Sequence, residues 1–122
     1  MKEDYLQYKL CDWMRNRDIM HFHVPNGGKR NKREAARFKA MGVKAGVHDL
    51  IILLSDARVI FIELKVGKNK LQPAQIKFDE WLKNQSHQSH LIHADSVEEG
   101  VLQLRSILQS YAPLYGHICP LS

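Results

Sequence analysis

Long apolar runs are absent from this 122-residue sequence, and none approaches the roughly 20 residues needed to cross a bilayer. The first ten residues, MKEDYLQYKL, also lack the apolar stretch of a signal peptide. Cysteine is scarce: Cys11 and Cys119 lie near opposite ends and match no metal-binding spacing, which favours free thiols. No repeat or low-complexity segment interrupts the chain. We therefore expect a single domain over residues 1–122, located in the cytoplasm, with no membrane partner.

The positive charge of the chain is concentrated in one segment. The formal net charge is +5, yet the run from Lys29 to Lys44 alone holds seven basic side chains against one acid, Glu34. A local positive field of this kind favours a polyanion such as DNA as partner. The candidate phosphate-binding residues are Lys29, Arg30, Lys32, Arg33, Arg37, Lys39 and Lys44. The alternative is a basic surface that is simply solvated.

Hydrophobic periodicity predicts alternating helices and strands. We expect helices over residues 3–16, 33–41, from 73 onward and over about 96–111, and strands over 19–24, 48–54, 58–65 and 90–94. Ser96 and Glu99 form a capping-box pattern before the last helix, and Trp13 and Trp81 fall on apolar helical stripes, which assigns both to the core. The two middle strands form a hairpin, and a crossover helix leads to the last strand. The fold class is therefore an α/β sandwich with a mixed central sheet flanked by helices.

Three charged residues interrupt the two middle strands, which are otherwise apolar on both faces. Burying charge is costly unless it is paired or bound to a metal, so Asp49, Glu63 and Lys65 need an explanation. The three-residue connection from Ser55 to Ala57 would place Asp49 directly opposite Glu63 across the hairpin, and Glu63 and Lys65 point to one face. Opposed carboxylates repel unless a divalent cation lies between them, and oxygen ligands suit Mg²⁺ or Mn²⁺.

A lysine next to such a pair can hold an attacking water and stabilise negative charge on a phosphate. Asp49, Glu63 and Lys65 therefore form a candidate phosphodiester hydrolysis site; the alternative is a structural salt-bridge cluster. Glu3, on the inward face of the first helix, could add a water-mediated ligand or take a proton, or could simply favour the helix dipole. Gln75 could hydrogen-bond toward the water or Lys65, or could act only as a helix-cap partner.

Histidine is plentiful, with seven residues, but we do not predict a histidine metal site. His87, His90 and His93 have a spacing suited to one helical face, yet the segment looks like a loop entering a strand. His21 and His23 share a strand face and could reach the site or DNA, although ordinary strand positions explain them.

The chain resembles a known nuclease family at these residues. The spacing Asp49-x13-Glu63-x-Lys65, with Gly46 before the aspartate and Gln75 downstream, is similar to the PD-(D/E)xK nuclease superfamily. More narrowly, the early glutamate and the G-x-x-D-L, I-E-L-K and L-x-x-x-Q segments resemble the virus-type replication-repair nuclease (VRR-NUC) domain, from Glu3 to about Ser96. One departure is His48, because the family usually has proline before the aspartate.

This resemblance implies a restriction-endonuclease-like fold and a metal-dependent endonuclease that hydrolyses DNA phosphodiester bonds. It implies Asp49, Glu63 and the backbone carbonyl of Leu64 as ligands of Mg²⁺ or Mn²⁺, and Lys65 as the catalytic lysine. Small members of the family are homodimers acting on branched DNA, similar to Holliday junction resolvases, which suggests a bacterial cell or virus-infected bacterial host. Two alternatives stay open: a flap or nicking nuclease acting as a monomer, and a non-catalytic DNA-binding module.

Overall fold

The computed structural model describes residues 1–25 and 31–111 of the chain. The elements follow in the predicted order, as α1 (Glu3–Arg15), β1 (His21–His23), α2 (Lys32–Ala40), β2 (Leu50–Leu53), β3 (Val59–Val66), α3 (Pro73–Asn84), β4 (Gln88–Ala94) and α4 (Val97–Gln109). Lys29, Arg30 and Cys119 lie outside the described residues, whereas Cys11 is a free, half-buried thiol. No helix in the described ranges is long and apolar enough to span a membrane.

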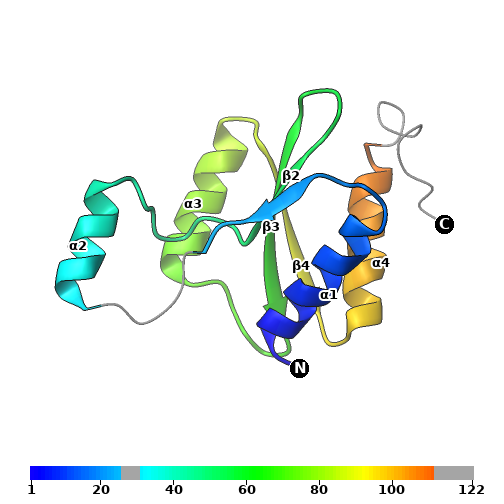
Figure 1. Cartoon of the computed structure of the whole chain (residues 1–122), viewed down its shortest axis with the longest axis horizontal. Coiled ribbons are helices and arrows are strands. Elements are labelled where there is room, and N and C mark those ends of the chain that lie inside the picture. The colour runs from blue at the N-terminus through cyan, green and yellow to red at the C-terminus, as the bar shows by residue number, and fades with distance from the viewer. Residues whose placement is uncertain (26–30, 112–122) are drawn as a thin grey trace.

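The sheet is mixed, as predicted. Its strand order is β1-β2-β3-β4; the first two pairings are antiparallel, and β3 pairs with β4 in parallel. Helix α3 provides the crossover between the two parallel strands. Helices α1 and α4 pack against each other on one side of the sheet, and α3 lies on the other (Figure 1). Helix α2 projects away from the sheet, and none of its residues is buried.

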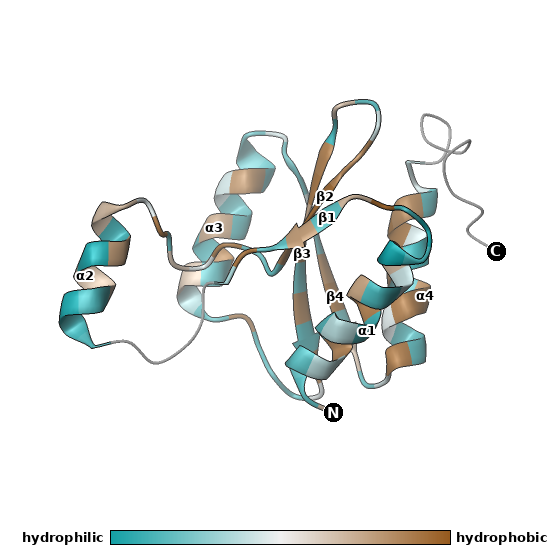
Figure 2. Cartoon of the chain, viewed as in Figure 1, coloured by the Kyte–Doolittle hydropathy of each residue, from teal (hydrophilic) through white to brown (hydrophobic). Residues whose placement is uncertain are grey.

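The core lies between the sheet and the α1–α4 pair. Apolar side chains from both helices meet alternate residues of the strands, and these contacts join Leu6, Leu10, Met14, Leu50, Ile52, Ile60, Ile62, Leu64, Ile92, Leu104 and Leu108. Strand β2 is wholly apolar and β3 is apolar except at Glu63 and Lys65, whereas α1 and α4 each alternate between apolar and polar residues (Figure 2). Gly100 allows the two helices to approach closely, because a methyl group there would come within 2.6 Å of Leu6 Cδ1. The even-numbered positions of β3 therefore belong to the core, and Glu63 and Lys65 face the other way.

Three sequence-based expectations need correction. Trp81 is 54% exposed and not part of the core. Leu82 is the buried residue of α3, and periodicity alone cannot show which side of an apolar stripe is covered. At α4, Ser96 caps the helix, because its hydroxyl accepts a hydrogen bond from Glu99 N. In a capping box the Glu99 carboxylate would accept from Ser96 N, but here it accepts from Asp95 N, one residue earlier. Strand β2 begins at Leu50, two residues later than predicted.

Candidate functional site

The hairpin register places Asp49 opposite Glu63. Leu50 pairs with Ile62 and Leu53 with Val59, so extending this antiparallel ladder by one residue brings position 49 to position 63. The register inferred from the three-residue connection is therefore confirmed. Asp49 immediately precedes β2, at the point where the backbone pairing with β3 stops.

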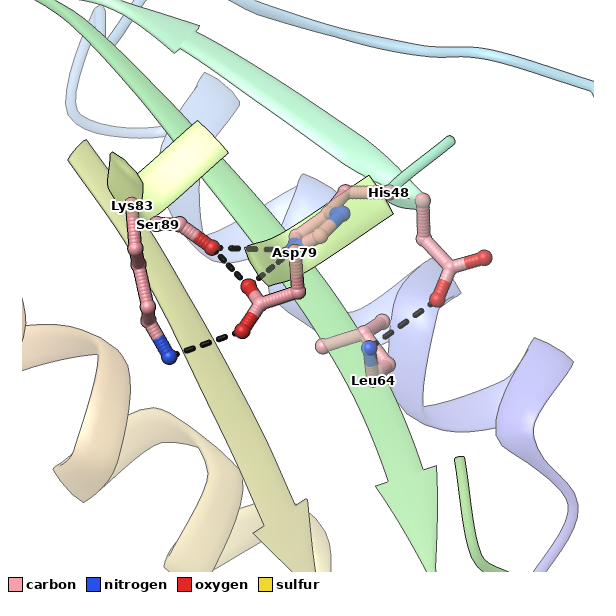
Figure 3. A network of polar contacts seen from close by, with 6 residues as sticks. His48, Leu64, Asp79, Lys83 and Ser89 are labelled. Carbon is pink, nitrogen blue, oxygen red and sulfur yellow. Dashed lines mark hydrogen bonds and ion pairs between the residues drawn. The ribbon is translucent and has the colours of Figure 1, made fainter. Parts of the chain in front are cut away.

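Asp49 is fixed by both its side chain and its backbone. Its Oδ2 accepts the Leu64 N–H at 2.9 Å, which is the bond drawn to Leu64 in Figure 3. Its carbonyl accepts Val24 N–H at 3.2 Å. The same carbonyl lies 2.7 Å from His23 Nδ1, which must therefore carry a proton and donate it. The carboxylate is thus held at the end of the sheet by contacts from β3 and from the β1 region.

Glu63 is buried without full compensation. Its side chain belongs to a residue only 2% exposed, and its Oε2 has no hydrogen-bond partner within the described residues. Burial raises the pKa of Glu63 from 4.5 to about 9, and the neighbouring Asp49 carboxylate adds to the rise while Lys65 opposes it. In the metal-free chain Glu63 is therefore protonated at neutral pH. This cost makes Glu63 a candidate for a role beyond filling space.

A divalent cation fits this arrangement. In an antiparallel pair the N–H and C=O of every second residue point to the neighbouring strand, and at Leu64 both point to the β2 side. The paired part of β2 starts at Leu50, opposite Ile62, so the Leu64 carbonyl faces the space beside Asp49. No group of three or more His, Cys, Asp or Glu side chains in residues 1–25 and 31–111 has a metal-binding arrangement. A cation here would thus rely on two carboxylates, one carbonyl and water, which is the oxygen set that Mg²⁺ accepts. The unpartnered Glu63 oxygen supports this fit, because a cation would compensate it.

The structure brings Glu3 to Lys65 across 62 positions of sequence. Lys65 is 7% exposed, and its Nζ lies 3.9 Å from Glu3 Oε1 at the start of α1. The other carboxylate oxygen, Oε2, accepts from Asn69 Nδ2 at 2.5 Å. Glu3 therefore sits between Lys65 and the turn after β3. At 3.9 Å the Glu3 carboxylate is beyond hydrogen-bond distance of Lys65 Nζ, so it acts on the ammonium group through its charge.

Gln75 caps α3 and also reaches the site. Its Oε1 accepts the Gln72 N–H at 2.7 Å, so the cap role considered from the sequence is real. Gln75 and Asp49 nevertheless line one cavity of about 340 Å³, with Asp4, Gln7 and His23 on its other walls. Glu63 and Lys65 do not line this cavity. Gln75 is thus placed beside Asp49 and has an amide NH₂ group left for a ligand.

Asp4, Gln7 and His23 were not assigned to the site from the sequence, although His23 was considered. All three line the cavity that holds Asp49. For Asp4 and Gln7 a signal existed, because they lie next to and one turn after Glu3 on α1. The position of His23 at the site depends on the pairing of β1 with β2, which places His23 opposite Leu50 and next to Asp49.

His48 occupies a second polar cluster, directed away from Asp49. Its Nε2 lies 2.9 Å from Asp79 Oδ1 and 3.0 Å from Ser89 Oγ, and Ser89 also donates to Asp79 (Figure 3). Lys83 Nζ lies 2.7 Å from the other Asp79 oxygen. Burial lowers the pKa of His48, which is only 1% exposed, although Asp79 opposes this shift. The cluster ties the segment before β2 to α3 and β4, and nothing in the sequence suggested it.

The described residues of the basic run are all exposed. Lys32, Arg33, Arg37 and Lys39 lie on α2, and Lys44 follows it. None of these five residues takes part in an ion pair within the described ranges. They form an uncompensated positive surface, which is compatible with both predictions made for the run, a phosphate-binding surface and a solvated one.

No model of a known protein family matches the chain, and no curated protein sequence matches it. Among solved structures, one described as "VRR_NUC domain protein" superposes on the chain with a TM-score of 0.70. The two sequences are 27% identical, and the match covers 94% of this chain and 91% of the other. The chain is a VRR-NUC domain. Its mixed four-stranded sheet with flanking helices agrees with the PD-(D/E)xK nuclease fold, so the predicted fold class and family are confirmed. The similarity supports a nuclease domain in general.

Proposed function

We propose that this VRR-NUC domain is a Mg²⁺- or Mn²⁺-dependent endodeoxyribonuclease that cuts branched DNA as a homodimer, in the manner of a Holliday junction resolvase. One observation supports it above the others: Asp49 lies opposite a buried Glu63 whose Oε2 has no partner in the described structure. A purely structural pair of carboxyl groups would be better replaced by apolar residues. A divalent cation gives the pair a reason to be there.

Asp49, Glu63 and the Leu64 carbonyl are the proposed ligands. When bound, the cation would lower the pKa of a coordinated water and stabilise charge developing on the phosphate. The chain contributes the ligand geometry: the Leu64 N–H keeps Asp49 oriented, and the strand keeps Glu63 rigid. Metal binding would also ionise Glu63, because a neighbouring cation favours the carboxylate form.

Lys65 is the proposed catalytic cation. Its ammonium group can hold the attacking water and donate a hydrogen bond to a phosphate oxygen as negative charge develops there. Glu3 would stabilise this ammonium group through its charge and would accept a proton or bind the metal through water. Gln75 would direct its amide NH₂ at the water or the phosphate. Both roles follow from position, since Glu3 contacts Lys65 and Gln75 lines the Asp49 cavity.

DNA is the proposed substrate because the nuclease site adjoins an uncompensated basic surface. The seven residues assigned to phosphate contacts are Lys29, Arg30, Lys32, Arg33, Arg37, Lys39 and Lys44, of which the last five are placed and exposed. Neutralising several phosphates would make DNA affinity fall steeply with salt. A homodimer is proposed because one chain carries one site, and two symmetric cuts require two.

The decisive experiment compares wild type with Asp49→Asn on labelled four-way junction, 5′-flap, splayed-arm and linear duplex DNA, with Mg²⁺, Mn²⁺ or EDTA. Asp18→Asn is a matched control, because Asp18 is exposed and outside the site. We expect wild type and Asp18→Asn to make paired, symmetric cuts in the junction with metal only. Asp49→Asn should lose cutting by about 10³-fold or more, because a metal ligand is removed.

Other outcomes would separate the two remaining readings. Single cuts near the branch of the flap substrate, by a protein that light scattering shows to be a monomer, would replace the resolvase reading with a flap or nicking nuclease. Equal DNA binding by all three proteins with no metal-dependent cutting would leave a DNA-binding module instead.

A further inference from the structure

A wide groove lies between α2 and α3, apart from the catalytic residues. It has a volume of about 1030 Å³, and both its walls carry aromatic and basic side chains. Those that matter are Phe38, Lys39 and Lys44 from α2 and the segment after it, and Lys77, Phe78 and Trp81 from α3. The groove is open to solvent, because α2 has no buried residue and Trp81 is 54% exposed.

The charge of the groove restricts what can bind there. Three lysines line it and no acidic side chain does. None of these lysines forms an ion pair in the part of the chain that the structure describes. A second copy of this chain would bring the same positive α2 surface against the groove, so self-association there is unfavourable. The complementary partner has regularly spaced negative charges and flat apolar surfaces.

We propose that this groove binds an unpaired stretch of DNA, with bases stacked on Trp81 and phosphates on Lys39, Lys44 and Lys77. Single-stranded nucleic acid has the required combination, and aromatic platforms inside basic grooves are the usual way of binding it. The Trp81 indole is already oriented for this role: it stacks with His87, with ring centroids 5.7 Å apart and planes at 23°.

The groove adjoins the catalytic cavity. Ala74, at the start of α3, lines both. Between them the chain after α2 presses against α3 at Gly46, where φ is +85° and a methyl group would overlap the Ala74 carbonyl. A strand leaving the cavity past this contact would enter the groove directly. Resting on the proposed nuclease function, the inference is that the substrate carries an unpaired segment beside the phosphate that is cut.

The test measures binding without catalysis. Fluorescent oligo-dT is titrated with the whole chain in EDTA, using wild type, Trp81→Ala and Lys77→Ala. We expect Trp81→Ala and Lys77→Ala each to weaken binding by about tenfold, consistent with the loss of one stacked base or one phosphate contact. Leu102→Ala and Lys9→Ala are matched controls, since both residues are exposed on α4 and α1.

A fluorescence readout reports on the groove directly. In a Trp13→Phe background Trp81 is the only source of tryptophan emission, because the sequence has two tryptophans. Oligo-dT should quench this emission with the same affinity that the titration gives, because stacked bases would contact the indole. Equal affinity in every variant, or no quenching, would overturn the inference. So would a Trp81→Ala variant that changes only the oligomeric state, because the groove would then be an interface between copies.

Cleavage separates failure of this inference from failure of the nuclease proposal. On junctions with and without single-stranded arms, Trp81→Ala should slow cutting of the armed substrate only. Intact cutting with unchanged oligo-dT binding would reject the groove and keep the nuclease. Loss of oligo-dT binding in the groove variants, with no DNA cut by wild type, would keep the groove as a binding site and reject the nuclease.

Discussion

Two consecutive residues, His48 and Asp49, lie in polar environments of different charge balance. His48 is held on its Nε2 side by Asp79 and Ser89, and the charge of Asp79 is balanced further by Lys83. Asp49 instead lies opposite another carboxyl group, that of Glu63, whose Oε2 has no partner in the described structure. The first cluster brings together groups of complementary chemistry, whereas the second brings together two acids, of which Glu63 must keep a proton, with its pKa raised to about 9.

On the proposed function, this difference separates polar residues that support the fold from those that bind a metal ion. In the His48 cluster, hydrogen bonds and opposite charges compensate most of the cost of burial within the chain, although His48 Nδ1 has no hydrogen-bond partner in the described structure. An uncompensated acidic pair lowers the stability of the metal-free protein, so its compensation must come from outside. The two kinds of site should therefore respond to substitution in opposite ways.

Replacing Glu63 by Gln should have the largest effect on activity. Glutamine keeps the shape but cannot act as a charged metal ligand, so DNA cutting should fall by about 10³-fold or more. In EDTA the same variant should unfold at a higher temperature than wild type near pH 8, because wild type must take up a proton at Glu63 on folding at this pH and an amide need not. Glu98→Gln on the exposed start of α4 provides the matched control. A Glu63→Gln protein that cuts at the wild-type rate would contradict the assignment.

Replacing His48 by Ala should affect stability instead. The change empties a buried site between Phe61 and Phe78, whose rings lie 6.2 and 5.7 Å from the imidazole, and leaves Asp79 without one partner. We expect a loss of about 2–4 kcal/mol in the free energy of unfolding, measured by urea denaturation. His87→Ala, at an exposed position, should change it little. Well below the melting temperature the folded His48→Ala protein should keep metal-dependent cutting, and its complete loss would mean that the two clusters act together.

The pH dependence of metal-free stability is a smaller effect that compares the two sites in one protein. The pKa of Glu63 is raised to about 9, so the folded state holds a proton that the unfolded state releases above 4.5. Stability in EDTA should therefore fall as pH rises through this window, by at most about 1.4 kcal/mol per pH unit. The lowered pKa of His48 acts in the opposite direction, because its stabilising effect is lost as pH falls below about 6.5.

Measurements between pH 7 and 8.5 therefore isolate Glu63. Urea unfolding of wild type in EDTA should show the downward slope there, and Glu63→Gln should flatten it. Saturating Mg²⁺ should flatten it too, because a bound cation favours the ionised carboxylate. A wild-type stability that does not change over this range in EDTA would mean that Glu63 is ionised without metal.

Much of the site follows from local sequence rules. The three-residue connection between β2 and β3 determines which residues face each other, because hairpin register depends on loop length. Strand alternation then places Glu63 and Lys65 on one face, and their charge in apolar strands predicts a functional role for them. These inferences needed no knowledge of residues far away in the chain.

The tertiary structure decided what lies next to these residues. Glu3 meets Lys65 only because α1 packs on the sheet, and His48 meets Asp79 and Ser89 from two other elements. Periodicity placed Trp81 and Leu82 on one apolar stripe of α3 but could not show which part of the stripe other elements cover. In the structure Leu82 is buried, and Trp81 is exposed beside a basic groove. The sequence by itself determined register, alternation and the chemistry of the acidic pair, because these depend on near neighbours along one hairpin. Burial, the raised pKa of Glu63 and the groove depend on contacts between distant segments, and only the folded chain brings those segments together.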